Sequence, residues 1–423
     1  GFEVGGDASN PLGGGVLKFV GLLRREQFQL REDFLSFGLN DALLGGVAQT
    51  ADNLTGETVG RLVWSHGNIA GWSVETGGEV AFNTLDSDVD LFEVPPTGPR
   101  TPVALPVSDV LVEEIRGEAF VSGGRKLTPT LAFDAGLAVE TSTLTVSGDA
   151  EAERTLTFFK PRSSLEWTPN ADWRLRAAIE RLVAQLDFND FVSGAEFANG
   201  RVNSGNPDVE PERTWRFAGV LERRVLTEGK LRLSVYYDRV QMVQDRIPTD
   251  LGLDAPGNLG DGRRVWFEAI ADLPLQAFRI PGGRLNMRWL LQDSDVEDPY
   301  TGRGRPFSGE QPWTFSANFR QDLKSLNTAW GVDYYAEGGL PQYRVNEIDV
   351  WNPDNDFFGA FVEHRPSART TVKLDVRNLL DRDIVRERDF FFPDRRTLQA
   401  SRYEERRRWQ GRSVTVSVKR TFG

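Results

Sequence analysis

The sequence predicts an all-β fold, a transmembrane antiparallel β-barrel of about seventeen strands. Three observations lead to this prediction. Apolar and polar side chains alternate along many segments, which is the period of a strand. Short turns and long loops also alternate along the chain, as they do when antiparallel strands place all short turns at one end. Finally, no apolar run is long enough for a membrane helix, so only strands could cross a bilayer.

Composition limits both the fold and the function. The 423 residues contain no linker or change in composition, so we expect one domain over residues 1–423. There is no cysteine, and the two histidines, His66 and His364, lie far apart near predicted turns, so neither a disulfide nor a metal site is expected. A net charge of −12 argues against nucleic acid as a partner. No signal peptide opens the sequence, and we expect it to begin inside a longer chain.

Gly, Pro, Asn and Asp mark the short turns of eight expected hairpins, and a final strand ends the sequence. The expected strands of the first half are Phe2–Asp7, Val16–Gln29, Glu57–Ser65, Gly71–Asn83, Asp109–Val121, Thr130–Ser142, Arg154–Glu166 and Trp173–Val183. Those of the second half are Glu212–Val225, Lys230–Val243, Arg263–Leu275, Arg284–Asp293, Trp313–Leu323, Thr328–Tyr343, Phe357–Glu363, Thr370–Leu380 and Val414–Phe422. The stretches between hairpins, such as 30–56 and 84–108, are expected as long loops.

The alternation within strands indicates which face meets lipid. Charged residues such as Arg232 and Asp238 oppose apolar ones, and such a face suits a wet lumen better than a dry core. The apolar face, expected in lipid, comprises Leu231, Leu233, Val235, Val372, Leu374, Val376, Val414, Val416 and Val418. An Arg on this face should cost about 2–4 kcal/mol near the bilayer midplane. An Arg at Ser234 or Thr415 should cost little.

The final strand carries a second signal. Val414, Val416, Val418 and Phe422 share one face, and Phe422 is the penultimate residue. A chain that ends on such a strand resembles bacterial outer-membrane barrels, in which the terminal aromatic belongs to the signal read by the insertion machinery. We therefore assign these four residues as the barrel-assembly signal. The alternative is the closing strand of a soluble barrel.

Four segments resemble the barrel region of TonB-dependent outer-membrane receptors. Gly205–Trp215 (GNPDVEPERTW) is similar to the family's G-N-P-x-L-x-P-E segment, and Phe159–Pro169 is similar to the hairpin before it. Leu374–Asp381 (LDVRNLLD) is similar to the N-L-F-D segment near the family's C-terminus, and Glu75–Asn83 resembles an earlier strand. Their order and spacing, together with the terminal Phe, identify the chain as a member of this family.

The resemblance implies a barrel of about twenty-two strands around an N-terminal plug, which an energy-coupling segment precedes. The plug, that segment and about five strands are not in this sequence. It also implies a cell outer-membrane location and three kinds of partner. These are outer-membrane lipid and lipopolysaccharide, the energy-coupling protein TonB acting through the missing plug region, and a small-molecule or chelate solute. We expect no cofactor.

The expected function is import of a scarce solute, such as a ferric siderophore, a vitamin or an oligosaccharide. A passive porin-like channel and a structural or adhesive barrel are the alternatives. No nucleophile elbow, phosphate-binding loop or paired-carboxylate motif appears, so we do not expect an enzyme.

The loop expected over Arg382–Arg408 is the candidate ligand site. It contains nine Arg and six acidic residues, in a chain that is acidic overall. Because Arg binds carboxylate and phosphate and aromatic rings offer stacking surfaces, we expect Arg395, Arg396, Arg402 and Phe391 to contact solute. The alternatives are salt bridges within the loop and contact with lipopolysaccharide phosphates.

Asp86, Asp88 and Asp90 resemble the start of a calcium-binding loop. Such a loop needs Gly at its sixth position and Glu at its twelfth, where this sequence has Leu91 and Thr97. We therefore expect the three carboxylates to lie on the solvated face of a strand above the membrane.

Overall fold

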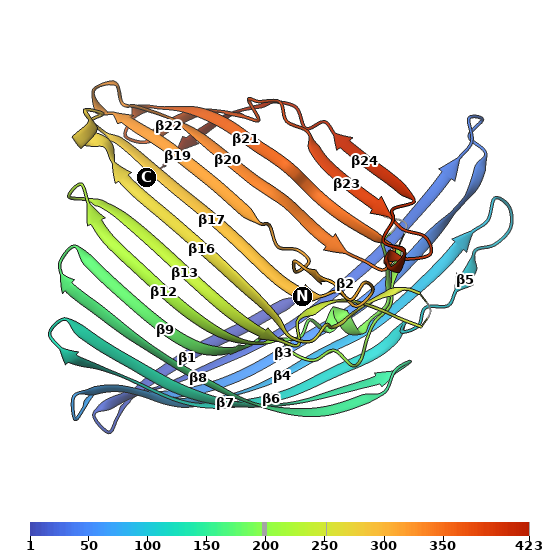
Figure 1. Ribbon diagram of the computed structural model, residues 1–423, viewed down its shortest axis with the longest axis horizontal. Helices are drawn as coiled ribbons and strands as arrows, with labels where there is room; N and C mark the ends of the chain where they lie inside the picture. Colours follow the sequence, from blue (N-terminus) through green and yellow to red (C-terminus); the bar gives the residue numbers. More distant parts are fainter. Residues whose placement is uncertain (197–200, 251, 423) are drawn as a thin grey trace. The chain divides into compact units, whose positions relative to one another are not determined.

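The computed structural model describes residues 1–196, 201–250 and 252–422 (Figure 1). Within these ranges the chain forms strands and a few short 3-10 turns. None of the described helical segments has the length and apolar content needed to cross a membrane. The chain forms two compact units. Unit 1 comprises Gly1–Ser164, Ile179–Trp215 and Val240–Gly260, and unit 2 comprises Leu165–Ala178, Arg216–Arg239 and Asp261–Gly423.

Long antiparallel strands form unit 1, where β2, β3 and β4 lie side by side (Figure 1). Its main strands are β1 (Phe2–Leu12), β2 (Gly15–Phe37), β3 (Leu43–Ile69), β4 (Trp72–Val94), β5 (Thr101–Val103), β6 (Asp109–Thr128) and β7 (Leu131–Gly148). A small second sheet contains β10 (Gly194–Glu196), β11 (Arg201–Asn203), β14 (Gln244–Pro248) and β15 (Asp254–Asn258). The 3-10 turn η1 (Phe188–Phe191) precedes that sheet.

Unit 2 continues the antiparallel pattern, and four strands have residues in both units. Those four are β8 (Ala152–Asn170), β9 (Trp173–Val183), β12 (Arg213–Val225) and β13 (Gly229–Gln241). The others are β16 (Gly262–Pro274), β17 (Gly283–Glu297), β18 (Gly304–Arg305), β19 (Trp313–Leu323), β20 (Thr328–Tyr343), β21 (Glu347–Ser367), β22 (Thr370–Arg377), β23 (Ile384–Phe390), β24 (Arg402–Arg408) and β25 (Ser413–Arg420). The 3-10 turns are η3 (Leu275–Phe278), η4 (Lys324–Leu326) and η5 (Arg395–Thr397).

Each of the expected strands has a counterpart, and three of them, Trp173–Val183, Trp313–Leu323 and Thr328–Tyr343, have the same bounds. The long loops are the part that the structure corrects. β2 and β3 pair without interruption from Val16 opposite Ser65 to Ser36 opposite Gly45, so most of 30–56 is strand. This part carries many polar residues and no continuous apolar face. Backbone hydrogen bonds need no such face, so the ladder continues where the sequence pattern stops.

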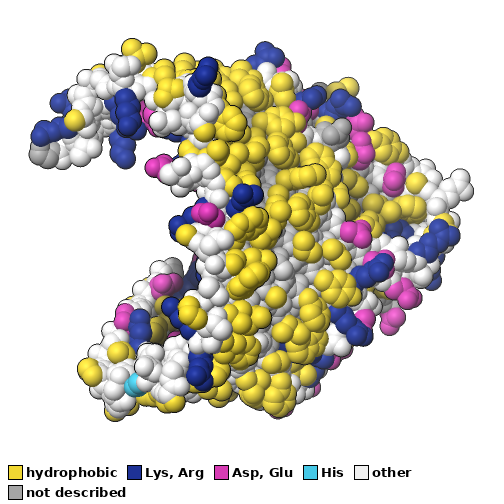
Figure 2. Space-filling model, turned by 60° about the vertical axis from the view of Figure 1, so that its left-hand side comes forward, with side chains coloured by type: hydrophobic (Ala, Val, Ile, Leu, Met, Phe, Trp, Pro, Cys, Tyr) yellow, Lys and Arg dark blue, Asp and Glu magenta, His cyan; other side chains and the backbone are white. Residues whose placement is uncertain are grey.

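Side-chain polarity is inverted relative to a soluble sheet. In β13, Leu233 and Val235 are 42% and 52% exposed, whereas Ser234 and Asp238, on the opposite face, are completely buried. Figure 2 shows a broad area of hydrophobic side chains on one face of the molecule, with charged side chains mainly toward its margins. Apolar side chains that face outward have lipid as their natural environment. The burial of Ser234 also corrects the expected tolerance of Arg there, because a larger side chain at a completely buried position must displace its neighbours.

The outer face of unit 1 changes from apolar to acidic at one level. Val80 and Ile115 are about 60% exposed, at 61% and 59%, and belong to the apolar part. We call the end of the strands opposite the short hairpin turns the loop end. Toward it, Asp88 on β4 pairs in register with Asp52 on β3 and with Asp109 on β6, and all three are exposed. Because lipid excludes charge, this row of carboxylates marks where the outer surface leaves the hydrocarbon. The expected position of Asp88 on a solvated strand face is therefore correct.

Candidate solute-contact surfaces

Five charged residues form one row on the inner face of unit 1. In register, Arg61 on β3 pairs with Glu79 on β4, Glu79 with Glu118 on β6, and Glu118 with Glu140 on β7. Lys160 of β8 forms ion pairs with Glu118 and, at 2.8 Å, with Glu140. Arg61 lies 3.2 Å from Glu79. Cations at both ends of the row thus pair with its three neighbouring carboxylates, as a polar inner surface requires.

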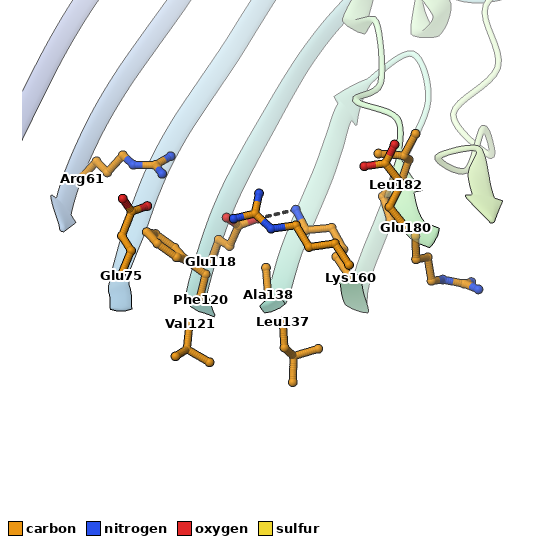
Figure 3. Close-up of a pocket in the computed structure, with 13 residues that line it drawn as sticks. Arg61, Glu75, Glu118, Phe120, Val121, Leu137, Ala138, Lys160, Glu180 and Leu182 are labelled. Atoms are coloured by element: carbon orange, nitrogen blue, oxygen red, sulfur yellow. Dashed lines mark hydrogen bonds and ion pairs between the residues drawn. The ribbon is translucent and has the colours of Figure 1, made fainter. Parts of the chain in front are cut away.

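A cavity of 320 Å³ opens along this row (Figure 3). Its charged lining residues carry both signs, and they are Arg61, Glu75, Glu118, Lys160, Arg162, Glu180 and Arg181. The guanidinium of Arg61 lies 5.0 Å from the ring centre of Phe120, which adds an aromatic face to the wall. Val121 and Leu137 point the opposite way, as the alternation of a strand requires (Figure 3). The wall can therefore offer ion pairs and hydrogen bonds to a polar solute.

Toward the loop end, the inner face of unit 1 becomes apolar and is covered. We call the covering segment the cap (residues 184–196 and 201–212). The buried cluster beneath and within it comprises Leu85, Val107, Val110, Val112, Leu144, Val146 and Phe191. Ser193 fixes the cap because its N–H donates to the carbonyl of Val107 at 2.8 Å, while its hydroxyl accepts from the N–H of Val107 at 3.1 Å. The cap is thus packed onto the strands like the core of a soluble protein.

The loop end of unit 2 is organised around buried carboxylates. Asp238 is completely buried and accepts from the guanidinium of Arg216 twice at 3.0 Å and from that of Arg264 at 2.9 Å. The ring of Trp266 lies 4.6 Å from the Arg216 guanidinium carbon, and Tyr236 stacks on Trp266 at 4.7 Å. Charge pairing and aromatic stacking together stabilise these partly buried cations around the buried carboxylate.

The Arg-rich segment is a hairpin rather than an irregular loop. β23 pairs with β24 from Ile384 opposite Arg408 to Phe390 opposite Arg402, and β23 also pairs with the start of β21. Many of its Arg residues form local ion pairs, including Arg388 with Glu404 and Arg407 with Glu405. These pairs agree with the alternative of salt bridges within the loop.

The four candidate ligand contacts differ in accessibility. Arg395 is buried, with 4% of its side chain exposed, and it is paired with Asp298, which argues against direct contact with solute. Arg396 is 72% exposed and pairs with Asp394 at 2.6 Å. Arg402 is exposed and lies 3.9 Å from the ring centre of Phe390. Phe391 is half-buried, and its N–H donates to the carbonyl of Asn346 at 2.8 Å. Arg396 and Arg402 are therefore the accessible members of the set.

Comparison with known proteins agrees with this architecture. The family model described as "TonB dependent receptor-like, beta-barrel" matches residues 12–379. The chain belongs to the TonB-dependent receptor β-barrel family. The predicted fold class, a transmembrane antiparallel β-barrel, is thereby confirmed, as is the outer-membrane location. No curated protein matches the sequence significantly.

Solved TonB-dependent receptor structures share the fold at low sequence identity. The ferric-catecholate import receptor Fiu of Escherichia coli K12 matches 99% of this chain and 64% of its own, with 11% identity and a TM-score of 0.68. The ferric yersiniabactin uptake receptor FyuA of Yersinia pestis matches 99% and 60%, with 13% identity and a TM-score of 0.69. The pyoverdine receptor FpvA of Pseudomonas aeruginosa matches 99% and 61%, with 12% identity and a TM-score of 0.69. The chain thus spans about three-fifths of these receptors.

The segment resembling the family's G-N-P motif has a structural role in the cap. A Cβ on Gly205 would lie 2.2 Å from the carbonyl oxygen of Phe191, so only glycine fits there. The guanidinium of Arg154 donates to the carbonyls of Asp208 and Val209, at 2.9 and 3.0 Å, and also to that of Pro207. In this TonB-dependent receptor chain, the motif therefore attaches the cap to β8.

The residues assigned as the assembly signal lie on the surface of unit 2. Val414, Val416 and Val418 are 65–67% exposed, and Phe422 is 82% exposed. β25 pairs with β22 from Ser413 opposite Arg377 to Arg420 opposite Thr370. The polar residues between these valines are exposed as well, so both faces of β25 are accessible. Its role in assembly stays a prediction.

Sequence reasoning placed Asp238 on the inner face of its strand, but it did not predict that Asp238 and Asp298 organise the loop end of unit 2. Each binds two Arg side chains, and Arg395 lies 97 residues from Asp298 in the sequence. Pairing at such distances leaves no local motif.

Proposed function

We propose that this chain is the barrel portion, over residues 1–423, of a TonB-dependent outer-membrane receptor that imports a scarce solute. The charged inner row of Arg61, Glu79, Glu118, Glu140 and Lys160, on strands whose other face is apolar, carries this proposal. A polar wall behind a lipid-facing surface suits passage of a hydrophilic solute. The missing plug region would provide the contact with TonB, and the outer surface would contact lipid and lipopolysaccharide.

Ferric chelates are the solute class we favour over vitamins and oligosaccharides. The titles of similar receptors name ferric-catecholate import, ferric yersiniabactin uptake and pyoverdine. Identity is only 10–13%, so this choice rests on kinship of fold. The exposed cations Arg396 and Arg402 support it further, because many ferric chelates are anionic and guanidinium binds anions well.

Uptake by the complete receptor tests the proposal. The gene, including its plug, would be expressed in a strain that lacks its own ferric-chelate receptors, and uptake of radioactive iron would be measured for a panel of chelates. We expect uptake of at least one chelate that stops when TonB is deleted. Uptake that persists without TonB would instead support the passive channel.

A pair of variants tests the inner wall. Lys160→Met leaves Glu118 and Glu140 without their shared cation, and should slow uptake while leaving the amount of inserted barrel unchanged. Val80→Ala, on the outer face, is the control and should transport normally. Equal uptake by the two variants would remove the inner row from the transport path.

A further inference from the structure

Asp298 links two segments of unit 2 that are distant in sequence. Its Oδ2 accepts from Arg305 Nε at 2.8 Å and from Arg395 Nη1 at 2.6 Å. Its Oδ1 accepts from the N–H groups of Tyr300 and Thr301, each at 3.0 Å. All its acceptor positions are therefore used, and only 1% of its side chain is exposed.

Arg395 is held by aromatic rings and a backbone carbonyl in addition to Asp298, although its Nη2 is buried without a hydrogen-bond partner among the described residues. The ring centres of Tyr300 and Tyr343 lie 4.8 and 5.8 Å from its guanidinium carbon, and its Nε donates to the carbonyl of Arg344. The second Arg bound to Asp298, Arg305, also contacts Tyr343, with its guanidinium carbon 4.4 Å from the ring centre. A guanidinium bound by a carboxylate and two aromatic rings has very little freedom to move.

Of the two chain neighbours of Arg395, Arg396 faces outward and Asp394 is buried. Arg396 follows it directly and is exposed, and Asp394, which pairs with Arg396, also caps η5 by accepting from the N–H of Arg396. We call residues 391–401, which connect β23 to β24, the hairpin tip. Arg402 stacks on Phe390 at the point where the tip joins β24. The exposed cations of the tip are thus attached to the segment that Arg395 holds down.

We propose that Asp298 is the positioning residue of the hairpin tip: by binding Arg395, it fixes Arg396 and Arg402 as one contact surface for an anionic solute. This inference rests on the proposed import function and specifies the solute's charge and its contacts. It assigns Arg395 a supporting role, in place of the direct contact expected from sequence. Two backbone bonds, from Phe391 to Asn346 and from Arg395 to Val345, also hold the tip, so loss of Asp298 should loosen it without unfolding the hairpin.

The first experiment measures order in the tip. In the complete receptor in nanodiscs, Asp298→Asn keeps the shape of the side chain but removes its charge. We expect amide exchange at residues 391–401 to become about tenfold faster, because these amides would open locally. Asp238→Asn is the matched control, since Asp238 is equally buried, lies in the same unit and pairs with Arg216 and Arg264 instead. It should leave the tip unchanged. Unchanged exchange in Asp298→Asn would overturn the proposal.

The second experiment measures binding with pyranine, a water-soluble aromatic trisulfonate, as the probe. We expect Asp298→Asn to weaken pyranine binding about fivefold and Arg395→Gln to do the same. The double variant should bind no more weakly than Arg395→Gln, because Asp298 acts through Arg395. A further loss in the double variant, or an equal loss in Asp238→Asn, would overturn the proposal.

Two further measurements keep the outcome interpretable. If Asp298→Asn does not insert, Arg395→Lys keeps the charge but loses the fork, and should show the same faster exchange at about half the size. A wild-type receptor that binds no pyranine would refute the anionic contact surface. Failure of import itself would appear separately, as the absence of TonB-dependent iron uptake.

Discussion

The loop ends of the two units bury their inner side chains by different interactions. In unit 1 the inner face becomes apolar, and the cap covers it with a cluster that includes Phe191 and Val112. In unit 2 the inner side chains stay charged, and Asp238 and Asp298 each bind two Arg side chains stacked on aromatic rings. Both arrangements bury the end of a strand. The first depends on packing and the second on charge.

This difference shows that an outer-membrane strand has no single polarity along its length. β4 carries Glu79 on its inner face at membrane depth and Leu85 and Val89 on the same face farther along, both buried. The outer face changes in the reverse sense, from Val80 to Asp88. The environment outside each segment, lipid or water, decides which face must be apolar. The two loop ends should therefore respond differently to mutation and to pH.

The largest expected effect is in the unit 1 cluster. Phe191 is completely buried, and Phe191→Ala should cost about 3–5 kcal/mol through lost burial and a residual cavity. Amide exchange in residues 184–196 would accelerate, while that in the hairpin 384–408 of unit 2 stays the same. Phe217→Ala is the control, because Phe217 is 44% exposed on the outside. If both variants cost the same, the cap is not a packed core.

The lipid-facing surfaces should behave alike in the two units, which would confine the difference to the loop ends. Val80→Arg in unit 1 and Leu233→Arg in unit 2 should each cost about 2–4 kcal/mol near the midplane. Refolding into lipid vesicles at a series of urea concentrations measures both. Thr415→Arg, on the opposite face of β25, should cost little. A large cost at Thr415 would contradict the assignment of faces.

Acid should separate the two loop ends. Burial alone would raise the pKa of Asp298, but the hydrogen bond and charge of Arg395 outweigh it and hold that pKa below its ordinary 3.8. In the cap, burial, together with the charge of Asp187, raises the pKa of Asp190. A lowered folded pKa gives stability that is present above the unfolded pKa and is lost as pH falls through the folded one. A raised folded pKa gives the reverse, stability that is lost as pH rises.

Lowering the pH from about 7 to about 3 should therefore loosen the hairpin tip of unit 2 and tighten the cap of unit 1. Amide exchange at both sites, corrected for the intrinsic effect of pH, measures the change. Asp190→Asn should abolish the tightening of the cap. Asp298→Asn should reduce the acid response of the tip, and the remainder should come from Asp394 and Glu404, whose pKa values are lowered by hydrogen bonds from Arg396 and Arg388. Loosening of both sites by the same factor would mean that acid acts on the whole barrel instead.

The smallest effect should come from an ion pair away from the loop end. Arg288 lies 2.7 Å from Glu268 in unit 2, and 54% of its side chain is exposed. Glu268→Gln should change the free energy of unfolding by less than about 1 kcal/mol, because water competes for exposed charges. An effect on the free energy of unfolding as large as that of Asp298→Asn would show that burial does not explain the contribution of the Asp238 and Asp298 ion pairs to stability.

The sequence was sufficient for the strands that cross the membrane. The alternation in Trp313–Leu323 and Thr328–Tyr343 and the turn residues between them predicted both bounds of each strand, since period and turn chemistry are local properties. The extensions of these strands beyond the membrane were missed because they lack this local alternation. β21 begins at Glu347, ten residues before the expected Phe357, because its first part pairs with β20 and β23 without an apolar face.

The candidate sites were predicted less well. The excess of Arg over 382–408 correctly drew attention to the hairpin, but composition cannot tell the buried Arg395 from the exposed Arg396 beside it. Their difference arises from Asp298, which reaches the hairpin only in the folded chain. The cap was missed because Phe191 and Val209 stand among loop-forming residues. Phe191 joins a core only in the folded chain, where it packs in a cluster with Val110 and Val112.

The acidic row of unit 1 also determines how the molecule resists force. Asp52, Asp88 and Asp109 lie at one level on three neighbouring strands. A pull toward the periplasm by three residues, about 10 Å along a strand, would bring these carboxylates into hydrocarbon. Burying charge in lipid is costly, so the row would oppose displacement of these three strands toward the periplasm.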